Sequence, residues 1–401
     1  MCGIVGAIAE RDVSRILLEG LRRLEYRGYD SAGIALLPAV GGQLALLRTV
    51  GKVNKLFDSL TKSNIQGSLG IAHTRWATHG KPSVKNAHPH TSSNEVAIVH
   101  NGIIENYTSL RKDLAGDGYA TKTDTDSEII AHLIHKERKG GKISLLNAVK
   151  KSAKKLHGAY GICVIDKLER DEVIVARSGS PLVLGLGLGE NFIASDPLAL
   201  GHVTDRFIYL EEGDIAKVSK SQIEIWNGPI KVTRKTTTLK TIVAEADKGH
   251  YKHFMLKEIN EQALAVKNTL DGRTTNNKIL EEAFGVKAKK IFDKVRNIQI
   301  VACGTSAHAG LVAKYWMETI AKTTCQVDIA SDYRYRDIIV RQGTLLVTIS
   351  QSGETADTLA ALRYAKKKGY IGSLAICNVP TSSLVRAVSY THLRAHETSI
   401  D

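Results

Sequence analysis

Residues 1–8 read MCGIVGAI, with a cysteine directly behind the initiator methionine and an apolar run behind a glycine. The run is typical of a buried β-strand, in which Cys2 is one more small apolar residue. The position also allows chemistry. If Met1 is removed, Cys2 carries both a thiol and a free α-amino group, which pairs a nucleophile with a base of pKa about 7.7–8.0. This stretch alone favours the structural reading, so the remaining sequence must decide.

The composition predicts a globular protein of more than one domain. The chain has 401 residues, 43% of them apolar and 24% charged, and a chain of this length is expected to form two or three domains. No apolar run approaches the roughly 20 residues that span a bilayer, and the apolar start lacks the basic region of a signal peptide.

The spacing of the cysteines favours a cytoplasmic protein, and the distribution of charge bears on its partners. The five cysteines stand far apart, which favours a reducing cytoplasm over a disulfide framework or a zinc site. The formal net charge of +14 is spread over scattered basic runs without interleaved aromatic residues. That distribution favours a solvated surface, so neither a nucleic acid nor a membrane is expected as a partner.

Residues 2–227 alternate β-rich runs with helical patterns. Strands are predicted in GIVGAIAE, SAGIALL, QLALLRTV, LGIAHTRW and EVAIVHNG, and a denser strand series begins at residue 159. Helices are predicted over residues 14–26 and 127–137, where apolar residues recur at three- and four-residue spacing. Several strands for each helix indicate stacked sheets with helices outside them, rather than a doubly wound parallel sheet.

The pattern changes in the second part of the chain. Residues 228–250 lose clear periodicity and are rich in threonine and lysine, so they are predicted to be a linker. A helix follows, and from about residue 296 strands and helices alternate as in βαβ units with a parallel sheet. Two strand-to-helix turns resemble each other, ACGTSAHAG at 302–310 and ISQSGETAD at 349–357.

Four polar or glycine positions in the first part suit cooperation with Cys2. Arg75 follows a strand-like run, where a guanidinium can hold a carboxylate by two parallel hydrogen bonds. Asn101 and Gly102 end another run, and an amide with an exposed glycine N–H suits a developing oxyanion. Asp126 precedes a helix and can bind an ammonium group. The structural alternatives are a surface ion pair, a turn and a helix N-cap, and none of the four positions is decisive alone.

Histidines crowd the same region, at positions 73, 79, 88, 90 and 100. No HExxH helix accompanies them, nor any cysteine or carboxylate partner at ligand spacing. A metal site is therefore not predicted, and these histidines are expected to be structural or to line a pocket.

The motifs CGIVGAI, RLEYRGYDSAG, HTRWATHG, HPH, VHNGIIENY and TDTDSEIIAHL resemble, in order and spacing, the class II (N-terminal nucleophile) glutamine amidotransferases. The form they resemble most is that of the isomerizing glutamine–fructose-6-phosphate aminotransferase family, and the resemblance covers residues 2 to about 388. It implies an αββα domain over residues 2–227. There Cys2, freed of Met1, would attack the side-chain amide of glutamine and use its own α-amine to move the proton.

The same resemblance implies roles for the surrounding residues. Asn101 and the Gly102 N–H would hold the oxyanion. The residues that would bind glutamine are Arg75 at the α-carboxylate, Asp126 at the α-ammonium, and Thr78 and His79 in the pocket. Tyr29 and Trp76 would gate ammonia on its way to a second site.

The two similar turns of the second part are typical of an anion site. SQSGET at 350–355 follows an apolar strand and opens a helix, so hydroxyls, the Gly353 backbone and the helix N-terminus converge there. CGTS at 303–306 repeats the arrangement. Plain capping of two helices is the structural alternative.

Both turns resemble the αβα sugar isomerase (SIS) domain of the same family, which implies a partial first SIS domain over residues 251–388. By that resemblance the phosphate is held by Ser350, Gln351, Ser352 and Thr355. The sugar is bordered by Cys303, Gly304, Thr305 and Ser306.

Residues 389–401 do not match the family, which continues beyond this point, so a C-terminally truncated chain with an aberrant tail is expected. The parent activity implied is transfer of the amide nitrogen of L-glutamine to D-fructose 6-phosphate, giving D-glucosamine 6-phosphate and L-glutamate. It needs no metal or other cofactor and is carried by a homodimer or higher homo-oligomer. This chain is expected to keep only the glutamine-hydrolysing half.

Two alternative functions remain. One is a class II amidotransferase with a different phosphosugar acceptor, although a phosphoribosyl or adenylating partner would need loops other than CGTS and SQSGET. The other is a sugar-phosphate sensor built on the SIS fold alone, which would have no use for Cys2 and the residues predicted around it.

Overall fold

The structure is a computed structural model that describes residues 2–25, 29–38, 41–76, 80–239, 251–270, 273–275, 278–284, 288–379 and 382–393. The chain divides into two compact units, residues 1–246 and 247–401. Across these described ranges, no helix is long and apolar enough to cross a membrane.

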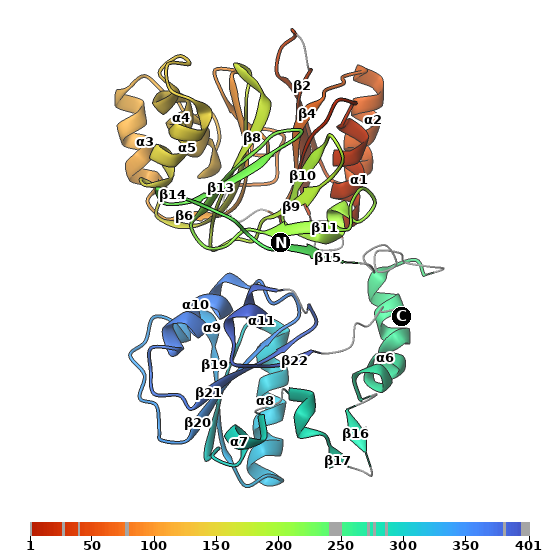
Figure 1. Cartoon of the computed structure of the whole chain (residues 1–401), viewed down its shortest axis with the longest axis vertical. Coiled ribbons are helices and arrows are strands. Elements are labelled where there is room, and N and C mark those ends of the chain that lie inside the picture. The colour runs from red at the N-terminus through yellow and green to blue at the C-terminus, as the bar shows by residue number, and fades with distance from the viewer. Residues whose placement is uncertain are drawn as a thin grey trace. The chain divides into compact units, whose positions relative to one another are not determined.

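Two antiparallel sheets form the centre of the first unit (Figure 1). The larger sheet has the order β15(Thr236–Thr238), β11(Arg206–Tyr209), β9(Val183–Leu186), β10(Asn191–Ala194), β1(Gly3–Ile8), β4(Leu69–Arg75), β2(Ser31–Leu37), β3(Ala45–Val50). The smaller has the order β14(Ile230–Val232), β13(Ile223–Asn227), β12(Asp214–Val218), β8(Glu169–Ser178), β7(Gly158–Asp166), β6(Val96–Ile104), β5(His90–Ser92).

Helices cover the outer face of each sheet, which gives four layers in the order predicted (Figure 1). The first flank holds α1(Ser14–Leu24), α2(Val53–Ser63) and the short η2(Pro197–Leu200). The second flank holds α3(Tyr107–Gly116), α4(Ser127–Arg138) and α5(Leu145–Ala153).

The opening stretch shows why the layers form. Every residue of β1 is buried, because the strand has a covered face on each side. Val5 and Ala7 pack with the helices α1 and α2, whereas Ile4 and Ile8 pack against the second sheet. The two-residue period of a strand thus sends one apolar pair into each of two cores.

The second unit carries a five-stranded parallel sheet, which confirms the predicted αβα pattern. Its order is β19(Thr324–Ile329), β18(Asn297–Ala302), β20(Thr344–Ser350), β21(Gly372–Cys377), β22(Tyr390–Leu393). One face packs with α7(Ala288–Phe292) and α8(Gly304–Thr319), and the other with α9(Ala330–Tyr333), α10(Ala356–Ala365) and α11(Ser383–Ala387). The unit also contains α6(Phe254–Leu270), β16(Thr274–Thr275), β17(Lys278–Ile279) and η3(Glu281–Phe284).

Some local structure differs from the sequence-based prediction. Residues 230–232 and 236–238, predicted as linker, form the edge strands β14 and β15, and residues 240–250 lie outside the described residues. Residues 390–393 of the predicted aberrant tail form the edge strand β22, which pairs with β21. Edge strands of only three or four residues are too short to show a clear two-residue alternation in the sequence.

Candidate active site

The position of Cys2 follows from the pairing of β1 with β4. Gly3 lies opposite Thr74, so Cys2 reaches the end of β4 beside Trp76. A Cβ on Gly3 would lie 2.7 Å from the Thr74 hydroxyl, so glycine allows this close approach. The main-chain N–H of Trp76 donates to the Cys2 sulfur at 3.2 Å, and the thiol lies 3.5 Å from the Trp76 carbonyl.

Burial raises the pKa of the Cys2 thiol, although the Trp76 N–H and the positive charges of Arg75 and the chain terminus act in the opposite direction. The thiol is therefore the stable form at neutral pH. A nucleophile in this state needs a base to remove its proton.

Asn101 approaches Cys2 from the other sheet. It lies within β6, which continues through Gly102 to Ile104, so the prediction that the strand ends at this pair and the alternative of a turn are both wrong. Its side-chain Nδ2 donates to the Cys2 carbonyl at 3.0 Å. Gly102 follows with φ +131°, a conformation that favours glycine. A Cβ there would lie 1.9 Å from the Ala159 carbonyl on the paired strand β7, so only glycine fits.

Arg75 ends β4 and is only 3% exposed. Its Nη2 donates to the Gly80 carbonyl at 3.0 Å, and its Nη1 lies 3.9 Å from the Asp30 carboxylate. The guanidinium is therefore held inside the fold, which contradicts the alternative of a surface ion pair.

Asp126 directly precedes α4 and is 4% exposed. Its carboxylate makes no capping bond to that helix. It accepts instead from the main-chain N–H of Ile104 at 2.8 Å and from the Ser127 hydroxyl at 3.3 Å. The capping alternative is therefore wrong. The carboxylate is tied to the end of β6, two residues beyond Gly102.

The other four residues predicted for the glutamine site are either more exposed than Arg75 and Asp126 or lie outside the described residues. Trp76 is 54% exposed, and Tyr29 is half-buried, which raises the pKa of its hydroxyl. Thr78 and His79 lie outside the described residues.

Four of the five histidines form a buried cluster. The rings of His73 and His88 lie 4.1 Å apart, and those of His88 and His90 lie 4.5 Å apart. Burial lowers the pKa of His73 and His90 to about 3 and also lowers that of His88 and His100, so the cluster is neutral at pH 7. In the part of the chain that the structure describes, no three potential ligands gather as a metal site would require.

Sequence reasoning missed the contact of His73, whose Nε2 lies 2.9 Å from Asn101 Oδ1. Strand periodicity places His73 with Leu69 and Ile71 on the inner face of β4, and Asn101 with Ala97 on the inner face of β6. This alternation could have shown that His73 and Asn101 each point to the inner face of their sheet. It could not have shown that the two residues meet, because that depends on how the two sheets pack.

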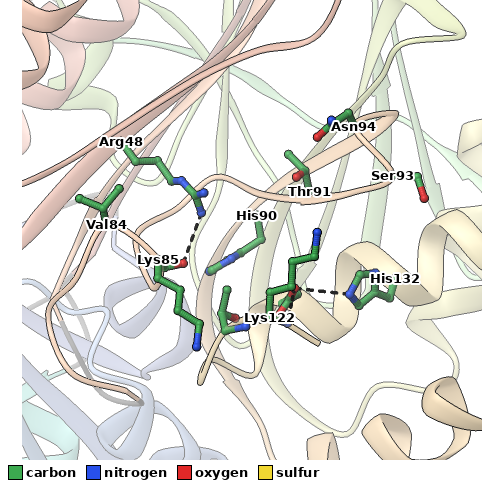
Figure 2. Close-up of a pocket in the computed structure, with 11 residues that line it drawn as sticks. Arg48, Val84, Lys85, His90, Thr91, Ser93, Asn94, Lys122 and His132 are labelled. Carbon is green, nitrogen blue, oxygen red and sulfur yellow. Dashed lines mark hydrogen bonds and ion pairs between the residues drawn. The ribbon is translucent and has the colours of Figure 1, made fainter. Parts of the chain in front are cut away.

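A pocket of about 470 Å³ lies beside this cluster but contains none of the predicted catalytic residues (Figure 2). Its lining is Arg48, Val84, Lys85, His90, Thr91, Ser93, Asn94, Lys122, Thr123, Glu128 and His132. Arg48 donates to the main-chain carbonyls of Lys85 and Ala87, in the loop before β5, and Glu128 accepts from the N–H groups of Lys122 and Thr123. The pocket brings together none of the residues predicted to act with Cys2, so we assign it no role.

In the second unit, the two similar turns lie side by side. CGTS follows β18, SQSGET begins at the last residue of β20, and these strands are parallel neighbours. From β18 the chain crosses to β19 on one side, and from β20 to β21 on the other. The two turns therefore flank the switch point of a doubly wound sheet, where such folds bind ligands.

The SQSGET turn is organised by its own hydroxyls. Ser350 Oγ accepts from the Gly353 N–H at 3.0 Å, and Ser352 Oγ accepts from the Glu354 N–H at 3.2 Å. Thr355 makes no capping bond to α10. Gly353 has φ +65°, and a Cβ there would lie 2.1 Å from Ser382 Oγ.

The other predicted residues of this edge differ in exposure. Gln351, Gly304 and Thr305 are exposed, and Cys303 and Ser306 are half-buried. Cys303 makes no capping bond to α8, and its sulfur lies 3.9 Å from the Thr358 hydroxyl on α10. Capping by these side chains therefore does not account for either turn.

Comparison with known proteins identifies both units. Residues 73–201 match the family described as glutamine amidotransferase domain, and residues 291–399 match the SIS domain. Glutamine–fructose-6-phosphate aminotransferase (isomerizing) of Pseudomonas putida is 57% identical over 394 residues, which are 98% of this chain and 64% of that protein. The enzyme of the same name from Idiomarina loihiensis is 55% identical over 387 residues, 96% of this chain and 63% of that protein.

A solved structure shows a similar fold. Glutamine phosphoribosylpyrophosphate amidotransferase from B. subtilis matches with a TM-score of 0.51 at 18% identity, over 94% of this chain and 81% of that one. At this identity the match shows likeness of fold alone. This chain spans about 64% of the length of the curated relatives it matches. Within that span, it belongs to the family of isomerizing glutamine–fructose-6-phosphate aminotransferases.

Proposed function

We propose that the first unit releases ammonia from L-glutamine at Cys2 and that the second binds D-fructose 6-phosphate. In the parent family these two sites serve amide transfer that yields D-glucosamine 6-phosphate and L-glutamate, and this chain, which spans about 64% of its relatives' length, would keep only the glutamine-hydrolysing half of that reaction. The observation that carries the proposal is the position of the Asn101 amide, whose Nδ2 reaches from the second sheet to within 3.0 Å of the Cys2 main-chain carbonyl. This contact brings a polar amide donor next to the residue that carries the thiol.

The chemistry begins at the Cys2 thiol. Removal of Met1 frees the α-amine of Cys2, which accepts the thiol proton as the sulfur bonds to the amide carbon of glutamine. The tetrahedral intermediate collapses when its C–N bond breaks, and the amine returns the proton so that ammonia leaves. Water then hydrolyses the thioester, which restores the thiol and releases glutamate.

Charge develops on the amide oxygen of glutamine in this step. The Asn101 amide uses one N–H for the Cys2 carbonyl, and its second N–H, together with that of Gly102, would stabilise the oxyanion. One preorganised donor of this kind accelerates acyl transfer by about 10²–10³-fold.

Buried charges would orient glutamine. Arg75 would hold the α-carboxylate and Asp126 the α-ammonium, which the burial of both charges supports. Thr78 and His79 complete the pocket in this proposal, and Tyr29 and Trp76 gate the released ammonia.

The switch point between β18 and β20 would hold the sugar phosphate. The phosphate-binding side chains are Ser350, Gln351, Ser352 and Thr355, and the sugar lies along Cys303, Gly304, Thr305 and Ser306. The location of both turns at adjacent carboxyl ends of parallel strands supports this assignment.

The proposal extends to the setting of the enzyme. We infer a cytoplasmic homodimer or higher homo-oligomer that uses neither a nucleic acid nor a membrane as partner. The five cysteines, all free thiols in this structure, fit a reducing compartment.

Two measurements on the full chain test the two half-sites. Glutamate release from L-glutamine should be detectable, and titration calorimetry should show fructose 6-phosphate binding more tightly than ribose 5-phosphate or inorganic phosphate. A chain that lacks Met1 and still does not hydrolyse glutamine contradicts the first assignment. Equal binding of all three phosphates contradicts the second.

A further inference from the structure

His73 connects the two sheets directly behind the predicted oxyanion site. It lies on β4 and is fully buried. Its Nε2 lies 2.9 Å from Asn101 Oδ1 and 3.1 Å from the His100 carbonyl. Both neighbours are hydrogen-bond acceptors, so Nε2 must carry the hydrogen.

The protonation state of His73 supports one fixed tautomer. Burial lowers its pKa to about 3, so the ring is neutral near pH 7. Within the described residues, its Nδ1 is buried and has no hydrogen-bond partner. The neutral ring therefore keeps its single hydrogen on Nε2, where it donates to Asn101 and His100.

The Asn101 amide is consequently oriented from both ends. Its oxygen accepts from His73, and its nitrogen donates to the Cys2 carbonyl. If the amide rotated by 180°, its oxygen would face the Cys2 carbonyl and its N–H₂ would face the His73 N–H. Both ends would then be repulsive, so His73 allows only one of the two rotamers.

We propose that His73 is a positioning residue for glutamine hydrolysis, which holds the Asn101 N–H toward the developing oxyanion. This inference rests on the proposed function of Cys2 and Asn101. His73 touches no reacting atom, and its effect should pass entirely through Asn101. Its loss should therefore cost less than the 10²–10³-fold typical of a deleted oxyanion donor.

Two substitutions separate positioning from packing. In His73→Leu the donor is removed while apolar volume is kept, so kcat for glutaminase should fall roughly 10- to 100-fold with KM within about threefold. His73→Gln restores an N–H near the position of Nε2 and should keep kcat within about threefold of wild type. His90→Gln is the matched control, because His90 belongs to the same buried cluster but its Nε2 bonds Thr125.

A double-mutant cycle gives the sharper test. In an Asn101→Ala background, His73→Leu should cause no further loss of kcat, because the group it positions is gone. If His73→Leu does not fold, as judged by near-ultraviolet circular dichroism, His73→Asn takes its place, since the shorter amide cannot reach Asn101.

Different outcomes overturn different claims. The positioning role is overturned if the losses of kcat multiply in the double variant, or if His73→Gln is as impaired as His73→Leu. Neither result touches the glutaminase activity of the wild-type chain. A wild-type chain that lacks Met1 and has no glutaminase activity overturns the proposed function, and this inference with it.

Discussion

Gly102→Ala is expected to damage both the stability of the first unit and its proposed chemistry. The backbone at Gly102 has φ +131°, a region that is essentially restricted to glycine and costs other residues about 1–3 kcal/mol. The new methyl group would also lie 1.9 Å from the Ala159 carbonyl. Because that neighbour is backbone within a paired strand, β6 or β7 must shift.

The size of the effect can be bounded from these two terms. Overpacking in a rigid region costs about 1–3 kcal/mol, so the combined loss is about 2–6 kcal/mol. For a unit of this size, each kcal/mol lowers Tm by about 2–4 °C, which gives a fall of roughly 4–24 °C. A shift of β6 also displaces Asn101, so kcat for glutamine hydrolysis should fall at least about 100-fold.

Calorimetry and a glutamate-release assay measure the two effects. Gly118→Ala is the control, because Gly118 also has a positive φ, +84°, but a Cβ there meets nothing within 4 Å. It should show the backbone strain without the collision and keep glutaminase activity. The reasoning is refuted if Gly102→Ala melts no lower than Gly118→Ala and keeps kcat within about threefold of wild type.

Three further predictions concern pH, substrate and the second unit. The pKa of His90 falls from 6.5 unfolded to about 3 folded, so its contribution is full above pH 6.5 and is lost as pH falls toward 3. Urea unfolding should therefore show stability falling across that window, and His90→Gln should reduce the slope by up to about 1.4 kcal/mol per pH unit. Arg75→Lys should raise KM for glutamine roughly 10- to 100-fold in steady-state assays, because an ammonium cannot form the paired bonds of a guanidinium. Gly353→Ala, whose methyl would lie 2.1 Å from the Ser382 hydroxyl, should abolish fructose 6-phosphate binding in calorimetry but spare glutaminase. Gly369→Ala, whose methyl meets nothing within 4 Å, should leave both binding and glutaminase unchanged.

The layered fold could be predicted from local pattern because its central strands are covered on both faces. A continuously apolar strand such as β1, accompanied by more strands than helices, already indicates stacked sheets. Likewise, the repeated turns 303–306 and 350–355 indicate one parallel sheet, and they lie at neighbouring strand ends.

Other features could not be predicted as readily. α3 buries only Leu110 and Leu114, so its apolar stripe is too narrow to stand out from a loop. β14 and β15 are three-residue edge strands whose pairing depends on the rest of each sheet.

The candidate site depends on tertiary structure in the same way. The sequence indicates that Asn101 and Asp126 suit an oxyanion and an ammonium group, but an isolated Asp before a helix more often caps it. Only the folded chain places the Asp126 carboxylate on the Ile104 N–H and the His73 ring on the Asn101 amide. These contacts join residues that are 22 and 28 positions apart, so no local sequence pattern could predict them.

The central claim, that Cys2 is a nucleophile whose base is its own α-amine, is tested most directly by intact mass combined with glutamate release. The account predicts a chain without Met1 that releases glutamate from glutamine, and complete loss of that activity in Cys2→Ala with folding unchanged. Turnover that survives in Cys2→Ala, or no turnover in a wild-type chain that lacks Met1, would contradict it.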